Sequence, residues 1–229
     1  MSSFILKIIA IISMSFDHVG YLIMGGSSWF NYIGRFAFPI FAFQISEGFI
    51  HTKSIKNYLL RLLIFAFISQ IPYMLFYSLV NDGLALNVIF TLLFGLLSII
   101  CYKHDKFLGI VAAIFLGFVA QYLHCDYGFY GVAITFLFYA LRTNKIFFVS
   151  GFLVATIINY ACRIFDYMEY GIAMLNYVFD FYMPYMLFTM LSSIFIVLYN
   201  KKKGPNTRYL LYLFYPLHLL LVYGISFLI

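Results

Sequence analysis

Charged residues are scarce in this chain. Asp, Glu, Lys and Arg make up 10% of its 229 residues and hydrophobic residues 65%, whereas charged residues are about 25% of an average soluble domain. The mean hydropathy is +0.98. These values exclude a soluble globular fold, because too few polar side chains remain to cover its surface. They also argue against a nucleic-acid partner, since the bases behind the net charge of +6 lie in short segments between apolar runs.

The sequence also has few cysteines and few motifs of known chemistry. Its three cysteines, Cys101, Cys125 and Cys162, are widely spaced and form no C-x-x-C pair, so we interpret them as buried or interfacial thiols. There is no phosphate-binding glycine loop, no G-x-S-x-G elbow and no dinucleotide fingerprint. The i, i+4 spacing of a helical metal site occurs only in the mixed pair Glu47 and His51, so no metal is predicted.

Long apolar runs dominate what is present. A membrane-spanning helix needs about 20 apolar residues, so a chain of 229 residues has room for eight or nine such helices and little else. We therefore predict an all-α, polytopic integral membrane bundle of about nine transmembrane helices, within a range of eight to ten, forming a single transmembrane domain over residues 1–229. The predicted spans are 4–24, 31–51, 57–80, 85–102, 107–123, 127–141, 146–161, 181–199 and 209–228.

The segments between these spans alternate in charge. The positive-inside rule assigns the basic set to the cytoplasm, which predicts a cytoplasmic N-terminus and a multi-pass protein of the cell (plasma) membrane, with the lipid bilayer as its surroundings. The first span carries a charge and exceeds a signal-peptide core in length, so we expect it to be retained. The basic set is Lys53, Lys56, Lys103, Lys106, Arg142, Lys145, Lys201, Lys202, Lys203 and Arg208, and the acidic set is Asp82, Asp126, Asp166, Glu169 and Asp180, with Arg163.

Two features leave the geometry of the bundle open. The stretch 161–180 is expected to be an outer loop with an interfacial helix, or, in a ten-span alternative, to enter the bilayer in part. Each proline within a span removes a backbone hydrogen bond. The result is either a simple kink or a released carbonyl that lines a polar cavity. The prolines concerned are Pro39, Pro72, Pro184 and Pro216.

Ionisable residues inside two of the predicted spans are the strongest functional signal. Such a group costs roughly 2.5–3.5 kcal/mol near the centre of a bilayer, so it usually has a partner or a purpose. The first span carries Asp17 beside His18, and the second carries Arg35 near its outer end. Because Asp17 and Arg35 have similar depths, we expect them to pair. The alternatives are helix packing through interhelical hydrogen bonds and snorkelling to the interface.

The inner half of the second span has a stripe of polar residues at spacings of three and four, Gln44, Glu47 and His51. Glu47 lies too far along the axis to reach Arg35, and its expected partner is His51 or Arg61. His218 follows Tyr215 and Pro216 in the last span. An imidazole at this depth is either a packing residue or a group that transfers protons near neutral pH.

Three segments carry a resemblance to a known family: LKIIAIISMSFDHVGY, then GRFAFPIFAFQISEGFIHTKSIKNYLLRLLIFAFISQIPY, and FYPLHLLLVY near the end. The chain resembles the TraX family over nearly its whole length. That family is named for a conjugation protein implicated in acetylating the pilin N-terminus, and it is distantly similar to membrane acyltransferases. The resemblance implies an N- or O-acetyltransferase that takes acetyl from cytoplasmic acetyl-CoA as co-substrate, without a metal. The implied acceptor is an amine or hydroxyl of a pilin N-terminus, a surface glycan or a small molecule.

The resemblance also suggests roles for particular residues. His18 best matches the membrane histidine of acetyl transfer, as general base or transient acetyl carrier, with Asp17 or Glu47 tuning it. Arg35 or His218 would stabilise the oxyanion or hold the acceptor. The residues expected to bind acetyl-CoA are Lys53, Lys56, Arg61, His51 and Gln44, with the Lys201 run as a further phosphate contact. A small transporter or flippase and a non-catalytic membrane scaffold are the competing interpretations, and the oligomeric state is left open.

Overall fold

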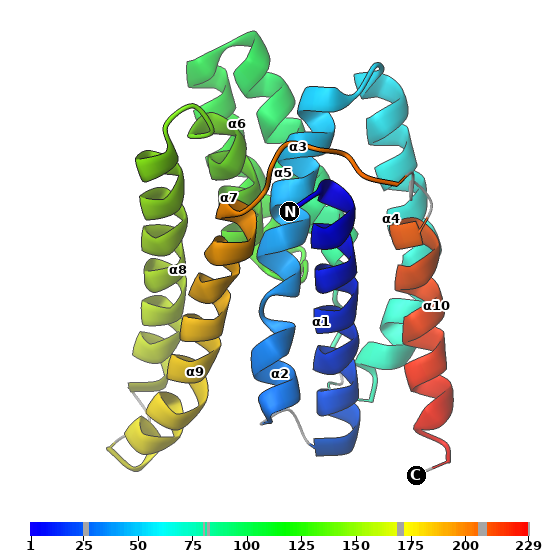
Figure 1. The fold of residues 1–229 in the computed structure, drawn as a ribbon. Coiled ribbons are helices and arrows are strands. Elements are labelled where there is room, and N and C mark those ends of the chain that lie inside the picture. The colour runs from blue at the N-terminus through cyan, green and yellow to red at the C-terminus, as the bar shows by residue number, and fades with distance from the viewer. Residues whose placement is uncertain (25–27, 80, 82, 169–171, 206–209, 229) are drawn as a thin grey trace.

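The computed structural model describes residues 1–24, 28–79, 81, 83–168, 172–205 and 210–228. In these residues the chain folds into α-helices with no β-strand (Figure 1). The single β-type contact in the described part of the chain is an isolated bridge between Leu86 and Cys125. The helices are α1 (Ser3–Met24), α2 (Trp29–Gly34), α3 (Ala37–His51), α4 (Ile55–Tyr77), α5 (Val88–His104), α6 (Lys106–Tyr122), α7 (Gly128–Ala140), α8 (Lys145–Met168), α9 (Ile172–Val197) and α10 (Leu210–Ile225).

Polar residues just before three helices determine where those helices begin. The side chains of Ser54, Asn87 and Asp105 accept hydrogen bonds from the backbone N–H groups of Asn57, Ile89 and Leu108, respectively. Each capping residue has an extended backbone, as an N-cap requires. An apolar run alone does not indicate the residue at which a helix begins, so these caps determine the first residues of α4, α5 and α6.

The second predicted span is divided at Arg35 and Phe36. Their N–H groups bond to Tyr32 O and Ile33 O, three residues back, and a regular helix resumes at Ala37. Pro39 lies in the first turn of α3, where its missing N–H costs little. The break therefore precedes the proline. Together α2 and α3 make one pass through the bundle.

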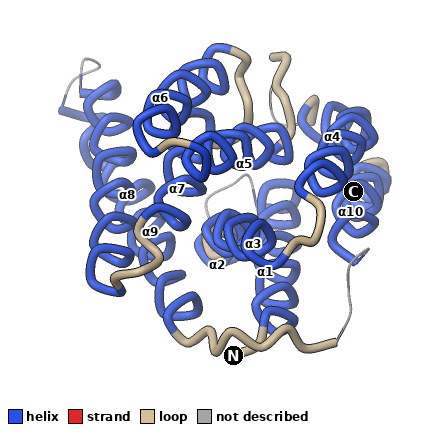
Figure 2. Tube along the Cα trace, turned by 90° about the horizontal axis from the view of Figure 1, so that it is seen from above, coloured by secondary structure: helices blue, strands red, loops and turns tan. Residues whose placement is uncertain are grey.

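The helices form a bundle with α3 near its middle (Figure 2). Helix α3 contacts α1, α5, α7 and α9, while α10 packs on α4 and α1, and α6 on α5 and α7. The N-terminus and the end of α10 lie at opposite ends of the bundle (Figure 1). Backbone hydrogen bonds from Ser3 to Lys202 and from Phe4 to Lys203 tie the start of α1 to the α9–α10 connection. We call this end, where Met1 lies, the basic end.

Within the described residues, four helical segments are long and apolar enough to cross a membrane: Ser3–Leu22, Ile55–Tyr77, Lys145–Asp166 and Phe179–Val197. Large apolar side chains on the outside of the bundle remain exposed, among them Ile71 at 72% and Phe115 at 65%. A soluble protein rarely presents a continuous surface of this kind, whereas lipid requires one. The chain is thus an all-α, polytopic membrane bundle, as the sequence predicted.

Apart from the division of the second span, the predicted spans match the helices closely except over residues 161–180. Helix α8 runs to Met168 and α9 starts at Ile172, so most of the stretch 161–180 extends two helices of a hairpin, and the expected outer loop with an interfacial helix is not what the described part shows. Asp82, Glu169 and Arg208 of the predicted loops lie outside the described residues.

Candidate active site

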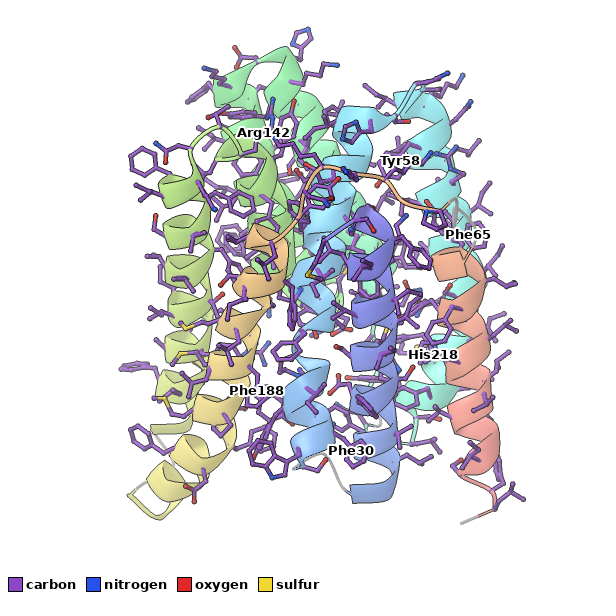
Figure 3. The ribbon with its side chains drawn as sticks, in the orientation of Figure 1. Phe30, Tyr58, Phe65, Arg142, Phe188 and His218 are labelled. Atoms are coloured by element: carbon purple, nitrogen blue, oxygen red, sulfur yellow. The ribbon has the colours of Figure 1, made fainter. Side chains whose placement is uncertain are left out.

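His18 of α1 and His218 of α10 are in direct contact. His18 Nδ1 and His218 Nε2 are 2.7 Å apart, and the two ring planes are within 5° of parallel. This separation is shorter than a face-to-face stack allows, since carbon atoms in contact keep about 3.5–4.0 Å. The rings therefore meet edge to edge in a hydrogen bond. Figure 3 shows His218 on the side of α10 that faces α1.

Asp17 and Arg35 form the ion pair that the sequence predicted. Nη2 of Arg35 donates to both carboxylate oxygens of Asp17, and Arg35 Nε donates to the carbonyl of Asn31 at 3.3 Å. The amide of Asn31, which is fully buried, donates to Asp17 O at 2.9 Å and to Asp17 Oδ1 at 3.2 Å. The guanidinium also lies 4.7 Å from the ring centre of Tyr185. This network joins α1, α2 and α9.

The ion pair depends on a close approach of α1 and α2. A Cβ atom added to Gly34 would lie 2.4 Å from the Cβ of Asp17, which is closer than packed atoms permit. We expect Gly34→Ala to lower the free energy of unfolding by about 1–3 kcal/mol, the range for overpacked sites. Thermal unfolding in detergent measures the effect. The matched control is Gly224→Ala, because no described residue has an atom within 4 Å of the Cβ position at Gly224. Equal midpoints for the two variants would contradict this account.

A cavity of about 390 Å³ lies beside these residues, toward the end of the bundle opposite Met1. We call it the tyrosine-lined cavity. Interhelical hydrogen bonds from Tyr130 to Thr156 at 2.9 Å and from Tyr160 to Thr189 at 3.1 Å hold its walls. Its residues are Asp17, His18, Tyr21, Arg35, Pro39, Tyr73, Phe76, Tyr77, Asn81, Asp126, Tyr127, Tyr130, Asn159, Tyr160, Arg163, Phe181, Tyr182, Tyr185 and Thr189.

The connection between α6 and α7 brings Asp126 to this cavity. Asp126 N donates to Leu86 O at 2.9 Å, and its carbonyl accepts from the hydroxyl of Thr91. The next residue, Tyr127, has a left-handed backbone and stacks on Phe38 with ring centres 3.7 Å apart. Burial raises the pKa of the Asp126 carboxyl to about 6. A carboxyl of this kind takes up or releases a proton near neutral pH.

A second cavity of about 750 Å³ lies toward the basic end. We call it the basic cavity, because five cations and one carboxylate are among the described residues that line it. Its volume and that of the tyrosine-lined cavity fall within the usual range for small-molecule sites, roughly 300–1,000 Å³. The cations are Lys7, Lys53, Arg61, Lys201 and Lys203, and the carboxylate is Glu47.

Four of the five residues predicted to bind acetyl-CoA line the basic cavity, namely Lys53, Arg61, His51 and Gln44. Lys56 is exposed and does not line it. The Nε atom of Arg61 is buried without a hydrogen-bond partner among the described residues, although the guanidinium lies 5.8 Å from the ring centre of Tyr58. A buried cationic donor of this kind favours an anionic ligand.

The histidine pair lies between the two cavities. Met14 lines the basic cavity, and His18, one helical turn further along α1, lines the tyrosine-lined cavity. On α10, Tyr215 lines the basic cavity and its ring centre is 5.6 Å from that of His218. One turn of α-helix advances about 5.4 Å. The linings of the two cavities are therefore about one helical turn apart at His18, whereas His218 lines neither cavity itself.

Comparison with known proteins identifies the family. A family model described as TraX protein matches residues 2–226. The chain belongs to the TraX family. A curated relative, the probable fimbrial assembly protein FimC of serogroup H1 from Dichelobacter nodosus, is 30% identical over 238 residues, which cover 96% of this chain and 94% of that protein. No solved structure matches.

The structure separates the residues that were predicted to act together in this TraX protein. Asp17, His18 and Arg35 line one cavity, whereas Glu47 lines the other, where its carboxylate is 3.5 Å from Nε2 of His51. Of the two carboxylates considered as partners of His18, Asp17 is thus the one that shares its cavity. The Nη2 and Nε groups of Arg35 donate to Asp17 and Asn31, so these two donors are already engaged.

Lys7, Asn31, Asp126 and the tyrosines of the cavity were not predicted as site residues. Lys7 could have been found, because Ser3, Lys7, Met14 and His18 follow one face of α1 at helical spacing. Asp126 was assigned to a loop on charge alone, and only the fold brings that loop beside His18. The tyrosines come from several helices and had no common pattern in the sequence.

Proposed function

We propose that this TraX protein is a membrane acetyltransferase that moves an acetyl group from acetyl-CoA to an amine or hydroxyl acceptor. The observation that carries the proposal is the position of His18 between a basic cavity and a polar, tyrosine-lined cavity. A donor with several phosphates suits the first cavity, and an uncharged or zwitterionic acceptor suits the second. Both reactants could then meet at one imidazole, as a group transfer requires.

The basic cavity is the proposed donor site. Acetyl-CoA carries phosphate groups at its nucleotide end, and Lys7, Lys53, Arg61, Lys201 and Lys203 would bind them through charge-assisted hydrogen bonds. The thioester end would extend toward Met14 and Tyr215 and so approach the histidine pair. The positive-inside rule, applied to the basic end, supports a cytoplasmic donor and a cytoplasmic N-terminus in the cell membrane.

The chemistry of transfer needs one base. The acceptor nitrogen or oxygen bonds to the acetyl carbon, the carbon–sulfur bond breaks, and His18 takes the proton that the acceptor loses. That proton then goes to the leaving thiolate of CoA, which restores the neutral imidazole. In the alternative route His18 itself accepts the acetyl group and passes it on. The name of the fimbrial relative, together with the pilin acceptor that the family resemblance implies, favours a surface-appendage subunit as the acceptor.

Acetyl-CoA binding to purified protein in detergent, measured by titration calorimetry, tests the donor site. We expect Arg61→Gln to weaken binding about 10- to 100-fold, because a hydrogen bond to a charged group contributes roughly 1.5–3 kcal/mol. Lys106→Gln is the matched control, since it removes the same charge from an exposed position at the same end of the bundle. Equal affinities of the two variants, or no binding by the unmodified protein, would contradict the assignment.

A further inference from the structure

We propose that His218 is a positioning residue that fixes His18 in the tautomer with its proton on Nδ1 and a lone pair on Nε2. Nε2 of His18 is then the atom that accepts the proton of the acceptor. The catalytic consequence rests on the proposed function. The tautomer itself does not, and it can be measured without turnover.

The hydrogen bonds determine the tautomers in sequence. His218 Nδ1 lies 2.9 Å from the carbonyl oxygen of Phe214, and a carbonyl only accepts, so this nitrogen carries the proton. In a neutral imidazole the other nitrogen then holds a lone pair. His218 Nε2 therefore accepts the bond that joins it to His18, and His18 Nδ1 must donate it across the 2.7 Å contact.

Packing holds both rings in this arrangement. The Phe214 ring is parallel to that of His218 within 5°, with ring centres 4.7 Å apart, and His218 is 7% exposed. On the other side of the pair, Phe76 of α4 lies 4.7 Å from His18, centre to centre. The rings are thus enclosed by α1, α4 and α10. Neither ring can turn over without displacing an aromatic neighbour.

The direction of the hydrogen bond from His18 to His218 matters for the chemistry. A histidine freed from such a contact can carry its proton on either nitrogen, and with the proton on Nε2 the base in the cavity is lost. A second group that holds Nδ1–H keeps the lone pair on Nε2, the nitrogen that we assign to the acceptor's proton. A carboxylate often has this role, but here Asp17 is engaged by Arg35 and Asn31, and a second imidazole replaces it.

Nitrogen NMR in lipid nanodiscs tests the tautomer directly. The protein would be labelled with ¹⁵N-histidine, with His51, His104 and His124 replaced by Gln so that the remaining signals come from His18 and His218. We expect Nδ1 of His18 to be protonated and Nε2 of His18 to be unprotonated. We also expect a scalar coupling between His18 Nδ1 and His218 Nε2 across the hydrogen bond. A His18 protonated on Nε2, or on both nitrogens, would overturn the proposal.

A pair of variants tests the consequence in the otherwise unmodified protein. His218→Gln retains an oxygen that can accept from His18 Nδ1, whereas His218→Leu does not. We expect His218→Leu to lower kcat about 10²-fold or more, within the range for losing a positioned base, with KM for acetyl-CoA unchanged and Nε2 of His18 protonated. His218→Gln should recover much of the rate. Equal losses in the two variants would overturn the positioning role.

The two proposals fail in different ways. If the unmodified protein transfers no acetyl group but shows the expected tautomer and coupling, the proposed function fails and the structural inference stands. If it transfers acetyl while His18 carries its proton on Nε2, the proposed function stands and the role of His218 is wrong.

Discussion

Replacing His18 by Gln is expected to lower the rate of acetyl transfer from acetyl-CoA by about 10²–10⁴-fold, the contribution of a positioned general base. Gln can still donate or accept a hydrogen bond at this position, but it cannot hold a proton and release it again. Affinity for acetyl-CoA should stay close to that of the unmodified protein, because the cations of the basic cavity are untouched. The release of free CoA thiol measures the rate, and calorimetry measures the affinity.

The control for this variant is His104→Gln, at the last residue of α5. His104 is exposed and lines neither cavity, so its replacement should leave the rate unchanged. A folded His18→Gln protein with full turnover would remove His18 from the mechanism. Solute movement by the unmodified protein without an acetyl donor would instead favour the transporter interpretation.

Removing one partner of the Asp17–Arg35 pair is expected to have the largest effect on stability. The side chains are 13% and 14% exposed, and a buried charge left unpaired costs about 3–5 kcal/mol. We expect Asp17→Asn or Arg35→Gln alone to lower the free energy of unfolding by that amount. The double variant should lose clearly less than the sum of the two, because it leaves no unpaired charge.

Reversible unfolding in mixed micelles gives the free energies of unfolding of the unmodified protein, the two single variants and the double variant. Asp166→Asn is the matched control, since Asp166 is an exposed carboxylate near the end of α8. Strictly additive losses would show that the two residues do not depend on each other. Under the scaffold interpretation the same variants reduce abundance, but His18→Gln then has no activity to remove.

Most of the fold was predictable because each pass through the membrane is predominantly apolar. The span predicted at 107–123 and helix α6, Lys106–Tyr122, differ by one residue at each end. The division of the second span into α2 and α3 was not predicted, only a kink or a released carbonyl at Pro39. Pro39 suggested an interruption within the span, yet the chain leaves the helix at Arg35, where the guanidinium reaches Asp17 and Asn31. A local signal gives no information on such a contact between helices.

The site was predictable to the extent that charge within an apolar run is conspicuous. Asp17, His18, Arg35 and His218 were found in this way. Their relations were partly predicted: depth along the helices paired Asp17 with Arg35. It did not pair His18 with His218, because the two are 200 positions apart in the chain and only the packing of α10 on α1 brings them together. The tyrosines and Asp126 were missed for the same reason, since each is unremarkable within its own segment.

The central claim is that the donor reaches His18 from the basic end of the bundle. Proteoliposomes test it most directly, with the orientation established by protease removal of an N-terminal tag and radiolabelled acetyl-CoA supplied to one side at a time. We predict transfer of label to an added pilin peptide or glycan extract only when acetyl-CoA is on the side of the N-terminus, and no transfer by His18→Gln protein. Transfer from the opposite side alone, or label transferred equally by the variant, would contradict it.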